Sequence, residues 1–497
     1  MQSTSPPPAL VDLVSMPNEI LLSVADNLSD EKDINNFART NRHLNSLLNP
    51  YLYAYDLKHN NGSALWWAVK HGQQGTAEKS LDAGADINAP AEPKSEHNNW
   101  TPPAPLLVRA VACRPRNIQY LRQELYQQYV QRHLSLLQLL IDRGVDIDAK
   151  DQDYGQTAVQ KAASQGDDEV VRLLIENGAD VHARCSSDNT VLHAAALACN
   201  AETINFLIDK GLDVNATHNT GGTPLHAAAS TSNIAAVRTL IDRGAVVQFV
   251  ANDRSTPLLL AARLEESTPT LEALINHGAN VNHRGEGNET PLHAATLAKN
   301  AAGVRLLIEH GAKADVGNTE GNSPLHHILR HKDFEPKLDL MKLLLENGAY
   351  VNFRNRYGSR PLHTAASTGD IDAVKLLIEH GADLDVQDSI GYTALHIAVG
   401  AAEIKKELVT LLLENGAFLG AKSDDGKEVL VPATWRTPAD NAWIEATLAK
   451  YGSKARKTSQ GSEGSTYVMR GLLYQMNSLC LMYVVLRAKK KKRAKKA

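Results

Sequence analysis

The stretch Thr223-Pro-Leu-His-Ala-Ala-Ala229 recurs along the chain with small changes, and its repetition decides the fold. The leucine of this motif returns seven times between Leu192 and Leu395, at intervals of 33 to 37 residues. A glycine that ends each following segment keeps the same interval from Gly178 to Gly416. Two landmarks that share one period indicate a tandem repeat, in which each copy is one small structural element.

Each position of the motif has a physical role that predicts two helices per repeat. Thr223 is a good helix cap, and Pro224 suits the first helical position, where its missing N–H costs nothing. Gly381 supplies the left-handed residue that ends a second helix. One repeat cannot bury its apolar positions alone, so its stability must come from stacking on its neighbours. Examples of these positions are Leu225, Ala228 and Ala229 in a first helix and Val374, Leu377 and Ile378 in a second.

These repeats resemble the ankyrin repeat family, whose unit is a β-turn with two antiparallel helices and a T-P-L-H-x-A start. Residues 358 to 385 show every part of that unit, whereas weaker copies begin near Ser63, Leu107 and Thr157 and a degenerate one follows Gly426. The resemblance covers residues 62–453, as about ten repeats with a degenerate C-terminal cap. It implies an all-α fold, an ankyrin-repeat solenoid of helix-turn-helix repeats with β-turn tips.

One histidine in most copies occupies the same motif position. Successive repeats place these rings about 10 Å apart, too far to share a metal ion whose ligand atoms lie about 2.0 to 2.1 Å away. A neutral imidazole at a helix start instead predicts a bond to the adjacent turn and to the threonine hydroxyl. One copy has Leu259 there, which also favours a structural role. The six residues are His193, His226, His293, His326, His363 and His396.

No motif of nucleophilic, phosphate-binding or metal-dependent catalysis is present. The chain has no G-x-x-x-x-G-K-S/T loop, no G-x-S-x-G elbow and no H-E-x-x-H pair. We therefore assign no catalytic, cofactor-binding or metal-binding residue and expect no enzymatic activity and no cofactor.

Insertions and turn tips are the candidate specificity elements. The proline-rich segment 90–105 is either a loop that binds a ligand or a connecting loop without a binding role. About 18 extra residues between Leu107 and Gly144 predict a lengthened helix that packs the stripe Ile118, Leu121, Leu125 and Tyr129 on the array, or a helix that docks a partner. The residues of the turn tips differ between repeats, which is expected both for a surface that binds a specific partner and for turns that only contact solvent. The candidate partner-binding tip residues are Thr217, His218, Asn252, Asp253, Asn318, Glu320, Arg356, Tyr357 and Asp388.

A second module, residues 13–57, precedes the repeats. Leu13 to Leu28 and Asp33 to Leu44 predict two short helices. They resemble the F-box, whose signature is L-P-x-E-I-L with a later D-L/I and R-x-L, although Met16 stands where a leucine is usual. The resemblance implies docking on the Skp-type adaptor of a cullin-RING ubiquitin ligase, and an F-box before ankyrin repeats resembles a type common in filamentous fungi. The adaptor-binding residues it implies are Met16, Pro17, Ile20, Leu21, Leu28, Ile34 and Phe37. The alternative is that these helices only cap the array.

Charge and cysteine usage limit the compartment and the partners. The net charge is −4, and eight of the last eleven residues are basic, which leaves the rest of the chain at −12. An acidic body disfavours nucleic-acid binding by the repeats. Four scattered cysteines and no basic residue before Lys32 favour a cytoplasmic or nuclear protein without a secretory leader.

The carboxyl terminus differs in character, with residues 1–12 as a flexible start, 454–466 as a linker, and 467–497 as an apolar helix with a polybasic tail. The 16 residues from Gly471 to Leu486 would span about 24 Å as a helix, short of the roughly 30 Å hydrocarbon core. Three alternatives remain open for this tail: a nuclear-import signal, a solvated charged end, and a membrane-surface or anchoring helix.

Together these features predict a protein that binds other proteins. The favoured function is the substrate receptor of a Skp-cullin-F-box-type ubiquitin ligase, with ankyrin repeats holding an unknown substrate protein. The alternative functions are an ankyrin scaffold or inhibitor without a ligase link, and an adaptor anchored to a membrane by its tail.

Overall fold

The computed structural model describes residues 53, 56–57, 63–89, 104–112, 123–198, 200–331, 334, 336–400, 405–426, 429 and 437–451. Segments 1–12, 454–466 and 467–497 lie outside the described residues, as do all but three positions of the module 13–57. The proline-rich stretch 90–103 and insert residues 113–122 lie outside them too. So do the seven residues assigned to the adaptor, namely Met16, Pro17, Ile20, Leu21, Leu28, Ile34 and Phe37.

The described chain is built from helix pairs and contains no strand. It divides into two compact units, unit 1 up to Asn252 and unit 2 from Asp253 onward. The first helices of the pairs in unit 1 are α4 (Ser63–Lys70), α6 (Leu106–Ala112), α8 (Ala158–Gln165), α10 (Val191–Ala198) and α12 (Pro224–Ser230). The second helices are α5 (Gln74–Asp82), α7 (Gln123–Asp142), α9 (Asp168–Glu176), α11 (Ala201–Asp209) and α13 (Ile234–Asp242).

Unit 2 repeats the arrangement with its own five pairs. The first helices are α14 (Pro257–Ala262), α16 (Pro291–Leu297), α18 (Pro324–Leu329), α20 (Pro361–Thr368) and α22 (Ala394–Gly400). The second helices are α15 (Thr268–Asn276), α17 (Ala301–Glu309), α19 (Lys337–Glu346), α21 (Ile371–Glu379) and α23 (Lys406–Glu414). A short 3-10 turn, η3 (Glu286–Asn288), and a final helix, α24 (Pro438–Tyr451), complete this unit.

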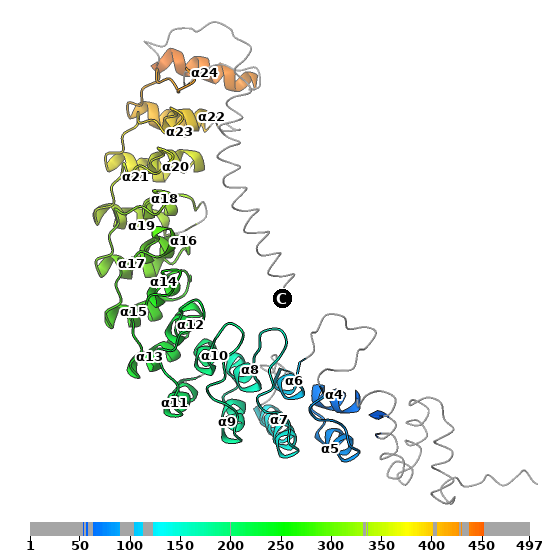
Figure 1. Cartoon of the computed structure of the whole chain (residues 1–497). Helices are drawn as coiled ribbons and strands as arrows, with labels where there is room; N and C mark the ends of the chain where they lie inside the picture. Colours follow the sequence, from blue (N-terminus) through cyan, green and yellow to red (C-terminus); the bar gives the residue numbers. More distant parts are fainter. Residues whose placement is uncertain are drawn as a thin grey trace, which may run out of the picture. The chain divides into compact units, whose positions relative to one another are not determined.

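Stacking within each unit places like helices side by side. In unit 1, first helices pack on first helices from α4 to α12, and second helices pack on second helices from α5 to α13 (Figure 1). The same two layers run from α14 to α22 and from α15 to α23 in unit 2. Alanines such as Ala228 and Ala365 are fully buried, because their small side chains let neighbouring helices approach closely.

Helix caps follow the sequence rules. In the second helices, Asn200, Asn300 and Asp370 accept a hydrogen bond from the backbone N–H three residues later, at 3.0, 2.7 and 3.0 Å respectively. Pro occupies the first turn of five first helices, α12, α14, α16, α18 and α20. The helix pair α20 and α21 therefore starts and ends as the sequence predicts.

The second repeat has a longer second helix, which both alternatives from the sequence allow. Helix α7 has 20 residues, whereas the equivalent α9 has nine. Its C-terminal half buries Leu136, Leu137 and Leu140 against the array. Of the predicted stripe, Ile118 and Leu121 lie outside the described residues, and the side chains of Leu125 and Tyr129 are not described either, so the packing of the stripe stays a prediction. None of the described helices is both long enough and apolar enough to cross a membrane.

Candidate functional site

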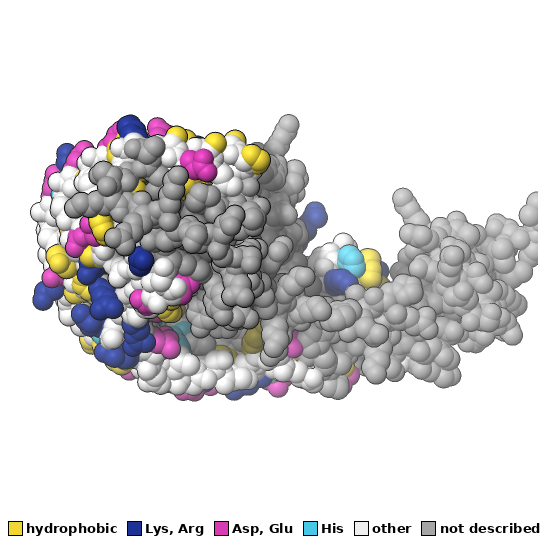
Figure 2. All heavy atoms as spheres, turned by 90° about the horizontal axis from the view of Figure 1, so that it is seen from above, with side chains coloured by type: hydrophobic (Ala, Val, Ile, Leu, Met, Phe, Trp, Pro, Cys, Tyr) yellow, Lys and Arg dark blue, Asp and Glu magenta, His cyan; other side chains and the backbone are white. Residues whose placement is uncertain are grey.

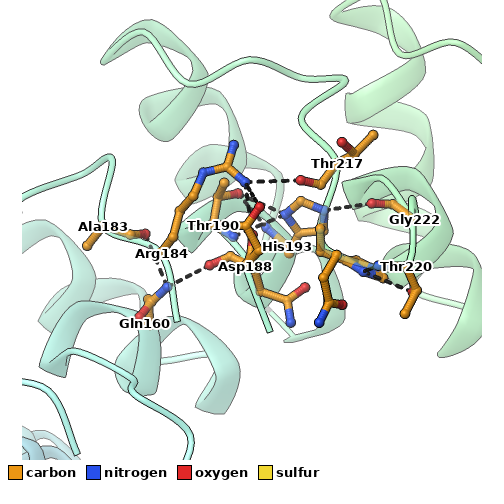
Figure 3. A network of polar contacts seen from close by, with 12 residues as sticks. Gln160, Ala183, Arg184, Asp188, Thr190, His193, Thr217, Thr220 and Gly222 are labelled. Atoms are coloured by element: carbon orange, nitrogen blue, oxygen red, sulfur yellow. Dashed lines mark hydrogen bonds and ion pairs between the residues drawn. The ribbon is translucent and has the colours of Figure 1, made fainter. Parts of the chain in front are cut away.

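Buried histidines link successive repeats, and His193 shows how (Figure 3). The Thr190 backbone N–H donates to His193 Nδ1 at 3.2 Å, and the Thr190 hydroxyl lies 2.9 Å from the same nitrogen. His193 Nε2 lies 3.1 Å from the carbonyl oxygen of Gly222, in the turn of the following repeat. Because Nδ1 accepts a backbone hydrogen bond, the ring proton is on Nε2, which donates to Gly222. The neutral ring thus forms hydrogen bonds with its own repeat and with the following repeat.

The same arrangement recurs in unit 2. His293 accepts from Thr290 N at 3.3 Å, and its Nε2 lies 3.0 Å from the Asn322 carbonyl oxygen. In the next repeat, His326 accepts from Ser323 N at 3.2 Å and reaches the Ser359 carbonyl at 3.3 Å. Of the six histidines with a predicted structural role, His193, His293 and His326 confirm it through these bonds. Both nitrogens of such a ring are already engaged, so neither is a ready metal ligand or proton acceptor.

Burial sets the protonation state of these rings. It lowers the pKa of His193, His293 and His326 to about 4, and the carbonyl bond made by each Nε2 offsets only part of that effect. The rings are therefore neutral at pH 7, as their hydrogen bonds require. Among the residues that the structure describes, no group of three or more His, Cys, Asp or Glu side chains is placed to hold a metal ion.

Gln160 replaces the histidine in the third repeat and makes the same bonds (Figure 3). Its Oε1 accepts from Thr157 N at 3.0 Å, and its Nε2 donates to the carbonyl oxygens of Ala183 and Asn189 at 3.2 and 2.8 Å. His363 contacts the equivalent positions of its own neighbour. A glutamine amide therefore offers the same hydrogen-bond donor and acceptor as the neutral imidazole and contacts the equivalent backbone groups.

This equivalence predicts the outcome of substitution at His363. Its Nδ1 accepts from Arg360 N at 3.1 Å, and its Nε2 lies 3.1 and 3.0 Å from the Val386 and Tyr392 carbonyl oxygens. We expect His363→Ala to lower the free energy of unfolding by about 2 to 4 kcal/mol, because buried partners lose their bonds. His363→Gln should cost less than about 1 kcal/mol. Urea unfolding at pH 7 measures both, and equal losses would contradict the proposed hydrogen-bonding role.

The turns between repeats form a row of fingers, each ending where the next first helix begins. Neighbouring fingers are joined by backbone hydrogen bonds: Arg356 N donates to Glu320 O at 2.9 Å, and Ser389 N to Tyr357 O at 2.9 Å. In unit 1, Ser186 N donates to Tyr154 O at 2.8 Å. The finger turns are residues 151–155, 185–188, 218–221 and 252 in unit 1, and 253–254, 285–288, 318–321, 355–358, 388–391 and 423–426 in unit 2.

Four of the predicted tip residues build the fingers themselves, and one of them, Asp253, is exposed although its Oδ1 accepts from Ser255 N at 2.9 Å. Asp388 is buried, and its Oδ1 accepts from Ile390 N at 3.0 Å and Tyr392 N at 2.9 Å. Asn318 Oδ1 accepts from Glu320 N at 3.0 Å, and His218 Nδ1 accepts from Thr220 N at 3.2 Å. These side chains fold the turn, so they are poor candidates for contact with a partner.

The remaining predicted tip residues divide by exposure. Thr217 is half-buried and its carbonyl oxygen accepts from Arg184 Nη1 at 3.0 Å (Figure 3). The exposed ones present their side chains to solvent, and Tyr357 is 55% exposed. They are Asn252, Glu320, Arg356 and Tyr357.

Two exposed residues next to finger glycines extend this set. Tyr154 is 56% exposed and Ile390 is 40% exposed. Both precede a finger glycine, Gly155 or Gly391, as Tyr357 precedes Gly358. Aligning the repeats on that glycine is the sequence signal that identifies Tyr154, which was not among the predicted tip residues.

Charge is divided between the two helix layers. All ten second helices carry at least one Asp or Glu, whereas the ten first helices of the described pairs carry none. The only Lys and Arg in those first helices are Lys70, Arg109 and Lys161. Elsewhere both charges are mixed, and on the face drawn in Figure 2 acidic and basic side chains lie interspersed with single hydrophobic ones.

The paired helices, the hydrogen-bonded fingers and the histidines that bond to the following repeat define a tandem helical-repeat protein. Proteins of this class bind other proteins through their exposed faces. A family model described as ankyrin repeats in three copies matches residues 127–218, 213–285, 265–354 and 333–423, which together exceed half of the chain. The chain belongs to the ankyrin repeat family. The repeats of this family are binding scaffolds, and they imply protein partners.

Two relatives found by sequence match short segments of the chain. A segment of 65 residues is 37% identical to the mouse ankyrin repeat and SAM domain-containing protein 6 and covers 13% of this chain and 7% of that protein. A segment of 47 residues is 51% identical to mouse transient receptor potential cation channel subfamily V member 5, covering 10% and 6%. The chain thus spans less than a tenth of the length of these relatives. The crystal structure of the human ASB11 ankyrin repeat domain aligns with 29% identity and a TM-score of 0.39, over 45% of this chain and 97% of that domain.

Proposed function

We propose that this protein is the substrate receptor of a Skp-cullin-F-box-type ubiquitin ligase. The observation that carries the proposal is the F-box-like pattern at residues 13–57 directly before an array of protein-binding repeats. The module captures the adaptor through Met16, Pro17, Ile20 and Leu21, and the array holds the substrate. Ubiquitin transfer belongs to the other subunits of such a ligase.

Joined fingers support the substrate-binding half of this proposal. Tyrosine is one of the residue types that contribute most to binding energy once a partner excludes water, and Tyr357 is exposed, with the exposed apolar side chain of Ile390 on the next finger. The backbone bond from Ser389 N to Tyr357 O fixes the two fingers relative to each other. A surface held in this way loses little conformational entropy on binding.

The adaptor half is tested by pull-down with a purified Skp-type adaptor. We expect wild-type chain to retain the adaptor, and the double variant Pro17→Ala with Ile20→Asp to lose at least 90% of that capture, because a charge enters the apolar contact. The matched control is Tyr357→Ala with Ile390→Ser, which alters the fingers and should keep full adaptor capture.

Wild-type chain that retains no adaptor would contradict the ligase proposal. The array would then act as a scaffold or inhibitor, one of the two alternative functions that the sequence allows. Equal capture by the wild type and the double variant would also contradict it, because binding would not depend on residues 13–57.

A further inference from the structure

Two neighbouring fingers of unit 2 carry exposed apolar side chains at the same position. Tyr357 is 55% exposed and Ile390 is 40% exposed, and each stands directly before its finger glycine. We call these two residues the apolar finger pair. Tyr154 in unit 1 has no such neighbour, because the next finger carries the polar residues Ser187 and Asp188. The pair therefore marks one place in the row of fingers of unit 2.

The two turns are built alike, so they place their side chains alike. Asn355 Oδ1 accepts from Tyr357 N at 2.9 Å. At the equivalent position of the next finger, Asp388 Oδ1 accepts from Ile390 N at 3.0 Å. The Ile390 carbonyl oxygen accepts from Asp424 N at 3.3 Å, as the Tyr357 carbonyl accepts from the finger after it. Because these backbone groups are engaged, a partner is recognised by side chains and not by addition of a strand.

The two ends of the pair differ in charge. Beyond Ile390, Asp424 is exposed and takes part in no ion pair within the described part of the chain. Beyond Tyr357, Glu320 is exposed, and its carbonyl oxygen bonds to the backbone of the exposed Arg356, whose opposite charge offsets it. Asp424 is therefore the charge that a partner meets, and a basic side chain complements it.

The repeat spacing specifies the form of that partner. Helices α20 and α22 begin just after these two fingers and pack side by side (Figure 1). Packed helices lie about 8 to 10 Å apart, and an extended chain advances about 3.3 Å per residue. An extended segment that crosses the fingers therefore presents about every third side chain to the next finger.

We propose that the apolar finger pair binds an extended segment of a partner protein, with two apolar side chains three residues apart and a basic one three residues further on. One apolar side chain packs on the Tyr357 ring and the other on Ile390, and the basic group meets Asp424. The proposal rests on the substrate-holding half of the proposed function and names the chemistry of the segment that is held.

Charge also bears on two other occupants. Asp424 repels phosphates, which excludes a nucleic acid from this place. The lysines of 489–496 in the chain's own tail complement Asp424 as well, so the test includes the tail as a competitor.

The test is fluorescence anisotropy of the full chain with two fluorescein-labelled peptides of identical composition, in about 50 mM salt. The spaced peptide is Lys-Ser-Ser-Leu-Ser-Ser-Leu-Ser-Ser-Lys, which presents a lysine to Asp424 in either chain direction. The clustered peptide, Lys-Ser-Ser-Ser-Leu-Leu-Ser-Ser-Ser-Lys, keeps the lysines in place and brings the leucines together. We expect the spaced peptide to bind at least about fivefold more tightly than the clustered one.

Substitutions locate the binding on the fingers. Asp424→Lys should weaken the spaced peptide about fivefold, and Ile390→Ser about tenfold. Glu379→Lys is an equal charge reversal at an exposed residue of α21, and Leu297→Ser removes an apolar side chain that is 39% exposed on α16. Both controls should change the affinity less than about twofold. Unchanged unfolding midpoints of all four variants show that lost binding is not lost folding.

The inference is overturned by equal affinity for the two peptides, or by equal effects of Asp424→Lys and Glu379→Lys. It is also overturned if glutamine in place of the lysines of 489–496 raises the affinity for the spaced peptide about tenfold, because the tail would then occupy the apolar finger pair. Adaptor capture uses residues 13–57, so loss of peptide selectivity with adaptor capture intact rejects this inference and leaves the ligase proposal standing.

Discussion

Acidification from pH 7 to pH 5 should lower the free energy of unfolding of unit 2 by roughly 6 kcal/mol, the sum for three buried histidines at about 2 kcal/mol each. Burial lowers the pKa of His293 and His326 to about 4 and that of His327 to about 2. The unfolded chain binds protons near pH 6.5, whereas the folded rings do not. Stability is therefore complete above pH 6.5 and is lost as the pH falls toward 4.

His327 permits the sharpest form of this experiment. Its side chain is 3% exposed, and its Nδ1 has no hydrogen-bond partner in the described part of the chain. Equivalent positions in unit 2 hold Leu260 and Ile397, so a leucine fits this layer. We expect His327→Leu to be no less stable than the wild type at pH 7 and to lose about 2 kcal/mol less between pH 7 and pH 5.

Urea unfolding followed by circular dichroism at a series of pH values gives both curves. The matched control is Leu260→Val, which changes the equivalent position of another repeat without altering a titratable group and should leave the pH dependence as in the wild type. A His327→Leu curve parallel to the wild-type curve would show that this ring does not titrate with folding.

The second large effect is expected at a finger glycine. Gly358 has φ +68°, and a Cβ there would lie 2.7 Å from Ser389 N and 2.9 Å from the Asp388 carbonyl carbon. An alanine costs about 1 to 2 kcal/mol for the left-handed backbone and about 1 to 3 kcal/mol for the clash with fixed backbone atoms. We expect Gly358→Ala to lower the free energy of unfolding by about 3 kcal/mol.

A substitution at Gly381 separates the cost of the left-handed backbone from the cost of the clash. Gly381 has φ +81°, but a Cβ there would meet nothing within 4 Å. Gly381→Ala should therefore cost only about 1 to 2 kcal/mol, the backbone part alone. Hydrogen exchange adds a local measure, because Gly358→Ala should expose the Ser389 amide that bonds to Tyr357 O. Equal losses for the two variants would mean that the fingers do not approach each other closely.

The repeat period and the histidine links could be predicted from the sequence, because both follow from local chemistry. Thr223 and Pro224 start helix α12, and histidine rings placed one per repeat cannot converge on one ion. Gly381 was likewise predicted to end a helix, and its positive φ confirms it. The close approach at Gly358 could not be predicted, since it depends on where the next repeat places its backbone.

Tip residues show the limit of prediction from one sequence. Asp388 and Tyr357 both lie in variable polar turns, yet Asp388 is buried in its own turn and Tyr357 is exposed. That difference depends on which side chain closes the turn, and the pattern of residue types does not encode it. Gln160 is a similar case, because only coordinates show that an amide makes the bonds of an imidazole.

The neutral, engaged imidazoles are the claim on which the rest depends, and nitrogen-15 resonances of the histidine rings test it most directly. In protein labelled at histidine, spectra at pH 6 should show His193, His293 and His326 as neutral rings protonated on Nε2, unchanged when zinc is added. Doubly protonated rings at pH 6, or signals that shift together with zinc, would contradict it and return these residues to the list of candidate ligands.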